Sequence, residues 1–170
     1  MNAENRRQAI LTMLSQSDVP VSAGALASRF SVSRQIIVGD IALLRASGED
    51  ISATPRGYVI PREHEGLIRT VACVHSKEQT EQELDIMVDN GCSVLDVVVE
   101  HPIYGQLTGQ LQISSRFEVS QFVDRLSKEG GSPLSALTGG IHLHTLRCPN
   151  EDAYRRTCDQ LRSAGLLLET

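Results

Sequence analysis

The chain has 170 residues, a net charge of −5 and 41% hydrophobic residues, which suits one medium domain or two small ones with packed cores. No apolar run approaches the roughly 20 residues that a membrane-spanning helix needs, and the polar N-terminus is unlike a secretory signal. The four cysteines are far apart and form no CxxC pair, which disfavours a disulfide framework or a four-thiolate zinc site. We therefore expect a cytoplasmic protein with no membrane attachment.

Charge is divided unevenly along the chain. Residues 1–62 carry a net charge of +2 and residues 63–170 a net charge of −7. A mildly basic N-terminal part followed by an acidic remainder is compatible with a DNA-contacting module joined to a body that does not contact DNA.

The N-terminal part has the pattern of three short helices and a hairpin. Apolar residues first recur at helical spacing, and Ser22 and Ser33 can then each cap a further helix. Residues 51–60 fit a small hairpin that turns at Pro55-Arg56-Gly57. This layout predicts a winged helix-turn-helix domain over residues 1–62.

The third of these helices carries side chains suited to reading DNA. If Ile37, Ile41 and Leu44 face the core, the outward face near the N-terminal end of the helix is left exposed. That end enters the major groove in helix-turn-helix proteins, where arginine can pair with guanine and glutamine with adenine. Arg56 at the wing tip suits a phosphate or minor-groove contact. The candidate DNA-binding residues are Ser33, Arg34, Gln35, Val38 and Arg56.

This segment resembles the helix-turn-helix module shared by the biotin repressor and its relatives. Residues 31–41 begin with Ser-Val-Ser-Arg-Gln, and Gly57-Tyr58 follows downstream. The resemblance implies that Ser-Arg-Gln opens the recognition helix and that Gly-Tyr lies in the wing. Gly39 departs from the long polar residue common at its position, so the helix is weakened by ~1 kcal/mol or lacks a phosphate contact. A three-helix protein-interaction domain is the alternative interpretation.

After a linker at residues 61–66, strand and helix patterns alternate. The order β-α-β-β-α-β-α matches the split βαβ, ferredoxin-like pattern with one extra helix. A loop rich in Gly, Ser and Pro covers residues 130–140. The two parts together predict an α+β protein whose second domain covers residues 67–170. The expected strands are 67–74, 92–100, 106–113 and 141–147, and the expected helices are 77–90, 115–129 and 151–164.

Three histidines of the second domain are expected to converge. His142 and His144 are two residues apart on one strand, so both project from the same face. The last strand should lie antiparallel beside the first, which brings His75 at the end of the first strand near His142. Glu83 borders the buried stripe of the next helix and can lean toward the same place. Three imidazoles and a carboxylate suit zinc, nickel or iron, with open positions left for a ligand.

Other side chains compete for these roles. A His-x-His pair on a strand is more often incidental than metal-binding. Cys73 shares a face with His75 and can substitute as a ligand, and Glu78 and Glu81 are rival carboxylates.

His101 is expected to lie away from the other histidines. It ends the second strand, which should run opposite to the first, so a strand length of roughly 17–20 Å should separate it from His75. Within one subunit His101 should therefore not bind the metal. With Tyr104 it can contact an effector or a partner subunit, or it can stabilise the turn.

Three motifs in order resemble the three-histidine (3H) domain over nearly all of residues 67–170. They are His75 with the helix of Glu83, then Glu100-His101-Pro102-Ile103-Tyr104-Gly105, then Gly139-Gly140-Ile141-His142-Leu143-His144. Combined with this helix-turn-helix, they are similar to the niacin-responsive repressors of NAD biosynthesis and niacin uptake genes. The resemblance implies nicotinic acid as co-repressor and one divalent transition metal per chain, nickel or zinc. The implied ligands are His75, Glu83, His142 and His144.

We therefore expect a repressor that binds double-stranded operator DNA as a homodimer, because a single winged helix buries little surface for high affinity. A metal-dependent hydrolase would need a general base beside the open metal position, and the obvious candidate, Glu83, is already used as a ligand. No nucleophile elbow, P-loop or nucleotide-binding fingerprint is present. A regulator with a different effector on the same scaffold is the other alternative.

Overall fold

The computed structural model describes residues 2–169, and the chain divides between Glu63 and His64 into two compact units. Each unit encloses a hydrophobic core of its own. Within the described residues, no helix is both long enough and apolar enough to cross a membrane.

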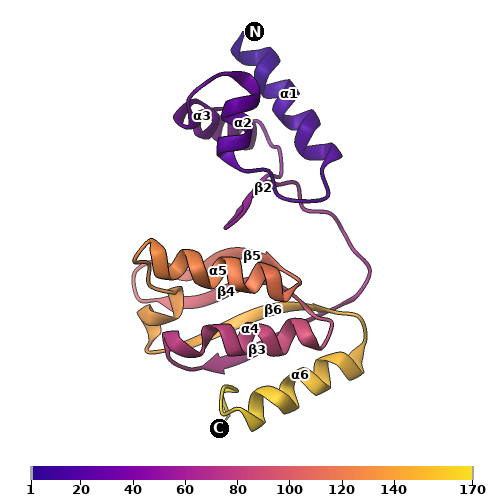
Figure 1. Ribbon diagram of the computed structural model, residues 1–170, viewed down its shortest axis with the longest axis vertical. Coiled ribbons are helices and arrows are strands. Elements are labelled where there is room, and N and C mark those ends of the chain that lie inside the picture. Colours follow the sequence, from indigo (N-terminus) through magenta and orange to yellow (C-terminus); the bar gives the residue numbers. More distant parts are fainter. Residues whose placement is uncertain (1, 170) are drawn as a thin grey trace. The chain divides into compact units, whose positions relative to one another are not determined.

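The described residues of the N-terminal unit form three helices and a two-stranded wing (Figure 1). Each helix begins at a polar cap, and the predicted caps Ser22 and Ser33 accept hydrogen bonds from backbone amides three residues ahead. Apolar residues of all three helices form the core. The elements are α1 (Ala3–Gln16), α2 (Ala23–Phe30), α3 (Arg34–Ala46), β1 (Ser52–Thr54) and β2 (Gly57–Val59).

The wing is tied to the helices by backbone hydrogen bonds. Val21 and Tyr58 exchange two of them, at 2.8 and 2.9 Å. Gly57 has φ +140°, and a β-carbon there would lie 2.4 Å from the backbone of Val21, so only glycine fits. The Nε of Arg45 in α3 donates to the Ile51 carbonyl at 2.7 Å. These contacts fix the wing against α3.

A buried carboxylate joins α3 to α1. Asp40 is 3% exposed and accepts a hydrogen bond from Nε of Arg6 at 2.6 Å, while a guanidinium nitrogen of Arg7 lies 3.6 Å away. A second, exposed ion pair joins Arg62 to Asp18. The pairing of Asp40 sets the position of α3 relative to α1.

The loss of helix stability that Gly39 causes in α3 can be tested by substitution. It is exposed within the helix, and a β-carbon placed there would meet no atom within 4 Å. Gly39→Ala should therefore raise the free energy of unfolding of the N-terminal unit by about 0.5–1 kcal/mol. Urea denaturation followed by circular dichroism measures the change. The reciprocal control at an exposed α3 position, Ala42→Gly, should lower it by a similar amount; a loss in both variants would contradict this account.

In the part that the structure describes, the C-terminal unit has four strands, three α-helices and two short 3₁₀ turns. The first strand has the predicted bounds, and the other predicted strands and helices differ by a few residues at their ends. The 3₁₀ turn at 134–138 lies within the segment predicted to be a loop. The elements are β3 (Leu67–Val74), η1 (Lys77–Gln79), α4 (Thr80–Asp89), β4 (Ser93–His101), β5 (Gly105–Ile113), α5 (Arg116–Lys128), η2 (Leu134–Thr138), β6 (Ile141–Cys148) and α6 (Glu151–Ser163).

The strands form one antiparallel sheet in the order β3-β6-β4-β5. The α+β class is confirmed, and so is the succession of strands and helices. A ferredoxin-like sheet has its last strand at an edge, whereas here β3 occupies the edge and β6 lies inside. Because β3 and β4 are both antiparallel to β6, they run in the same direction. The expectation that the second strand opposes the first is therefore wrong, since a strand-helix-strand crossover returns the chain in its original direction.

Helices cover one face of this sheet. In Figure 1, α4 and α5 lie in front of the strands and α6 lies beside β3. Apolar side chains from these three helices pack on alternate strand residues to form the core. The other face is not covered by α4, α5 or α6, and we call it the open face. Its residues include Ile68, Thr70, Ala72 and Val74 of β3, Ile141, Leu143, Thr145 and Arg147 of β6, Val98 and Glu100 of β4, and Gln106 and Thr108 of β5.

Candidate functional site

Three imidazoles surround one carboxylate on the helix-covered side of the sheet. His75 follows β3, His142 and His144 project from β6, and Glu83 reaches them from α4; all four are at most 9% exposed. The imidazole rings meet edge to face, with centroids 4.8 and 4.9 Å apart. The structure thus brings the four predicted ligands together. The distances from Nε2 to a Glu83 carboxylate oxygen are 2.8 Å for His75, 2.8 Å for His142 and 3.3 Å for His144.

Main-chain carbonyls hold the opposite nitrogen of each ring. A carbonyl oxygen only accepts hydrogen bonds, so each Nδ1 must carry the proton and donate it. The Nε2 atoms, which face Glu83, then keep their lone pairs, as is usual for histidines that bind metals. The Nδ1 bonds join His75 to Ser76 at 2.8 Å, His142 to Gly140 at 2.8 Å and His144 to Asp96 at 2.7 Å.

Gly140 lets two parts of the site approach each other. It has φ +97°, and a β-carbon there would lie 2.5 Å from the carbonyl oxygen of His75. Its own carbonyl accepts hydrogen bonds from the backbone amide of His75 and from Nδ1 of His142. Any larger residue at this position would push the end of β3 away from the start of β6.

The centre of the cluster favours positive charge. Neutral rings protonated at Nδ1 direct lone pairs at a carboxylate, which repel unless a proton or a cation lies between them. Burial alone would raise the pKa of Glu83, but the three imidazoles hold that pKa well below its usual range. Burial would likewise lower the pKa of His75 and of His144, but the Glu83 carboxylate raises both.

The preference of this centre for a positive charge is clearest at Nε2 of His75. This atom is buried 2.8 Å from a Glu83 oxygen, yet the geometry is not that of a hydrogen bond, and this nitrogen has no hydrogen-bond partner among the described residues. A buried nitrogen of this kind fits a donor to a metal ion.

Of the rival ligands, only Cys73 lies in the cluster. Its sulfur, a Glu83 oxygen and a His142 nitrogen lie within 4.8 Å of one another, close enough to share one ion. Burial, and then the charge of Glu83, raise the pKa of the Cys73 thiol. Glu78 and Glu81 are exposed on the surface.

His101 is placed differently from the prediction. Because β3 and β4 run in the same direction, His101 lies at the same end of the sheet as His75, and the expected separation by a strand length is wrong. Its ring closes the turn between β4 and β5, where Nδ1 accepts hydrogen bonds from the backbone amides of Ile103 at 3.2 Å and Tyr104 at 3.3 Å. Tyr104 is 73% exposed, with its ring centroid 5.1 Å from that of His101.

The predicted DNA-binding residues lie at the start of α3 and in the wing turn. Ser33 caps α3, and the side chains of Arg34, Gln35 and Val38 are exposed beside this cap. Arg56 is half-buried in the turn between β1 and β2. The exposed end of α3 therefore presents one cation and one amide.

Known proteins match both units. A family model described as an HTH domain matches residues 6–59, and one described as a 3H domain matches residues 68–170. The chain is 43% identical over 169 residues to the transcription repressor NadR of Bacillus subtilis (strain 168), an alignment that covers 97% of this chain and 94% of that protein.

A second relative is the probable transcription repressor NiaR of Thermotoga maritima. The two chains are 43% identical over 166 residues, which cover 98% of this chain and 95% of the relative. Both alignments run through the HTH and the 3H domains. The chain therefore belongs to the family of transcription repressors that join an HTH domain to a 3H domain, and not to a family of enzymes.

Proposed function

We propose that this protein is a cytoplasmic, metal-containing repressor of NAD biosynthesis or niacin uptake genes, which binds operator DNA as a homodimer with nicotinic acid as co-repressor. The observation that supports a bound metal is the buried carboxylate of Glu83, which faces three Nε2 atoms. Main-chain carbonyls orient the rings of these three histidines. The niacin part rests on the family resemblance and on the two related repressors.

The metal of this proposal is one divalent nickel or zinc ion per chain. His75, Glu83, His142 and His144 would hold it, because imidazole nitrogens with a carboxylate suit these ions better than magnesium or calcium. When bound, the ion supplies a positive centre that can accept a carboxylate ligand. The sulfur of Cys73 lies close enough to this centre to be an alternative ligand.

The effector contact in this proposal is the turn between β4 and β5. Tyr104 is the exposed side chain of the turn, and His101 holds the turn in place through its two backbone hydrogen bonds. We infer that this pair contacts the effector or the partner subunit.

In the proposed DNA contact, Arg34 and Arg56 have different roles. Arg34 and Gln35 read base edges in the major groove, and Val38 can meet a thymine methyl group. Ser33 fixes the start of the helix, and Arg56 contacts phosphate or the minor groove. In this proposal the N-terminal unit recognises DNA and the C-terminal unit senses the effector.

The DNA contact is tested by two substitutions. Arg34→Ala should weaken operator binding by about 1–3 kcal/mol and relax sequence preference at one base pair, whereas Arg56→Ala should weaken specific and non-specific binding alike. Gel-shift titrations with operator and scrambled DNA at fixed salt measure both. Operator binding by both variants as tight as wild type would show that a different face of the unit contacts DNA.

A further inference from the structure

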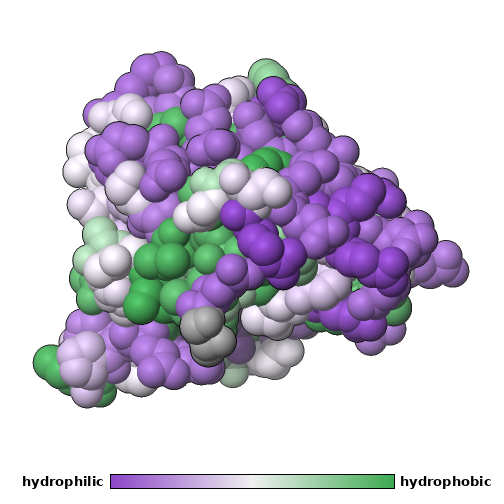
Figure 2. Space-filling view, turned by 90° about the horizontal axis from the view of Figure 1, so that it is seen from below, coloured by the Kyte–Doolittle hydropathy of each residue, from purple (hydrophilic) through white to green (hydrophobic). Residues whose placement is uncertain are grey.

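The open face of the sheet is partly hydrophobic. Ile68 and Ile141, at opposite ends of the β3–β6 pair, are 51% and 47% exposed. Ala72, Val74 and Leu143 are half-buried, and the polar pair of Thr70 and Thr145 lies between Ile68 and these residues. Figure 2, which views the protein from below and therefore from the side of β3 and α6, shows hydrophobic surface gathered in one area beside hydrophilic surface. Exposed hydrophobic side chains on an uncovered sheet face are compatible with an interaction surface.

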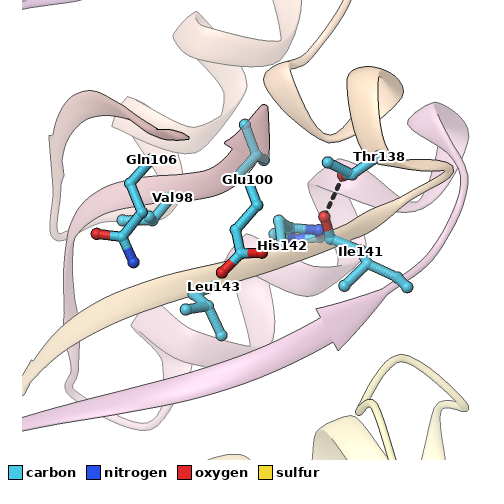
Figure 3. Close-up of a pocket in the computed structure, with 8 residues that line it drawn as sticks. Val98, Glu100, Gln106, Thr138, Ile141, His142 and Leu143 are labelled. Carbon is cyan, nitrogen blue, oxygen red and sulfur yellow. Dashed lines mark hydrogen bonds between the residues drawn. The ribbon is translucent and has the colours of Figure 1, made fainter. Parts of the chain in front are cut away.

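A hollow lies at one end of the open face. It has a volume of about 340 Å³. Residues of three strands and of η2 line it, and they include one of the proposed metal ligands: Val98, Val99 and Glu100 of β4, Gln106 of β5, Thr138 of η2, and Ile141, His142 and Leu143 of β6 (Figure 3). Its walls are mostly hydrophobic, and Glu100 brings a carboxylate to it. This combination suits a side chain with a hydrophobic stem and a positive end, such as arginine.

An arginine lies at the opposite end of the same face. Arg147 pairs with Ser93 at the start of β4, whereas Glu100 is near the end of that strand. Nε of Arg147 is buried and has no hydrogen-bond partner among the described residues. The two side chains are about 20 Å apart along the strands, so Arg147 and Glu100 of one chain cannot pair with each other.

We propose that the open face is the interface between two copies of this chain, packed sheet against sheet about a two-fold axis perpendicular to the strands. The inference rests on the homodimer of the proposed function and names its contact surface. The axis reverses the strand direction of the second copy. Arg147 of each copy therefore meets the hollow and the Glu100 carboxylate of the other, and the pair occurs twice.

The size of the face is sufficient for such a dimer. Four strands of eight or nine residues, spaced about 4.8 Å apart, give a face of about 500 Å². Two copies would then bury about 1,000 Å², the lower end for a specific interface. Sheets packed in this way keep their strands within about 30° of each other, which brings the two ends into register.

The test is a charge exchange on the full-length protein, measured by sedimentation equilibrium. Glu100→Arg and Arg147→Glu each place like charges opposite one another twice, so each should raise the dimer dissociation constant at least about tenfold. The double variant restores opposite charges and should return to within about threefold of wild type. The matched control is Glu129→Arg, which makes the same charge change at the end of α5 and should leave the constant unaltered.

The outcomes separate this interface from the homodimer itself. A dimeric wild type whose constant does not change in either single variant, or single defects that the double variant does not repair, would overturn the interface while the homodimer stands. A wild type that is monomeric at all concentrations and on operator DNA would overturn both. A lower melting temperature in the single variants without a change of mass would show that the face is covered within one chain, which also overturns the proposal.

Discussion

The His142→Ala/His144→Ala variant is expected to purify without metal, whereas the wild-type protein should carry about one divalent transition ion per chain. Both histidines direct Nε2 at Glu83 from one strand, so the substitution removes two of four donors. His75, Glu83 and the thiol of Cys73 then remain. Because burial and the charge of Glu83 raise the pKa of this thiol, we expect it to stay protonated and not to complete a site for zinc or nickel. Elemental analysis of the purified proteins measures the metal content, and circular dichroism checks that the variant folds.

His101→Ala is the matched control. This histidine lies at the same end of the sheet, but its ring is bonded within its own turn, so the variant should keep its metal. Loss of metal in the His101 variant would contradict the ligand assignment, and a metal-free wild type would remove the metal from the proposal.

The pH dependence of metal binding has a defined direction. Protons compete with a metal for imidazole nitrogens, so affinity falls as pH falls. Glu83 raises the pKa of His75 and of His144, so this competition should begin at a higher pH than for a free imidazole.

Nicotinic acid is expected to tighten operator binding by a factor on the order of 5–150, the usual range for coupled sites. An effector controls DNA affinity only if it binds the DNA-competent arrangement more tightly than the other. The coupling is reciprocal, so operator DNA should tighten nicotinic acid binding by the same factor. If the carboxylate of the effector occupies an open metal position, the metal-free protein should lose the response and keep weak basal binding.

The measurement is operator affinity with and without nicotinic acid, at fixed salt, for wild type and the His142/His144 double variant. Equal affinities in wild type would remove nicotinic acid as the effector and favour a regulator that responds to another small molecule. An equal response in both proteins would contradict a role for the metal in sensing. Nicotinamide, which lacks the carboxylate, is the matched control ligand and should give a weaker response.

Local patterns were enough to predict much of the fold and the cluster. Alternation along a strand places His142 and His144 on one face, and the hydroxyls of Ser22 and Ser33 mark helix starts, because each depends only on neighbouring residues. The sequence alone did not distinguish Glu83 from the other candidate carboxylate ligands, Glu78 and Glu81. A 3₁₀ turn precedes α4 at Thr80, which sets the helical phase that buries Glu83 and exposes Glu81.

Of the features that depend on long-range geometry, the antiparallel pairing of β3 with β6 was predicted and is confirmed, but others were not. The direction of β4, and with it the position of His101, follows from the crossover through α4. The carbonyls of Gly140 and Asp96 that orient two imidazoles belong to the main chain, where residue type gives no signal. The pairing of Asp40 with Arg6 joins residues 34 positions apart, and single-sequence periodicity does not report such contacts.

The pairing of Asp40 with Arg6 affects how operator binding should respond to ionic strength. DNA binding is weakened by salt in proportion to the number of phosphates that protein cations neutralise, because each neutralised phosphate releases counterions. Arg6 and Arg7 are engaged by Asp40, and Arg62 by Asp18, so three of the seven arginines in the N-terminal unit already form ion pairs, with two carboxylates between them. Few cations are left to displace counterions, and the salt dependence of binding should be shallow. Occupancy of the operator would then follow the effector more closely than the ionic strength of its surroundings.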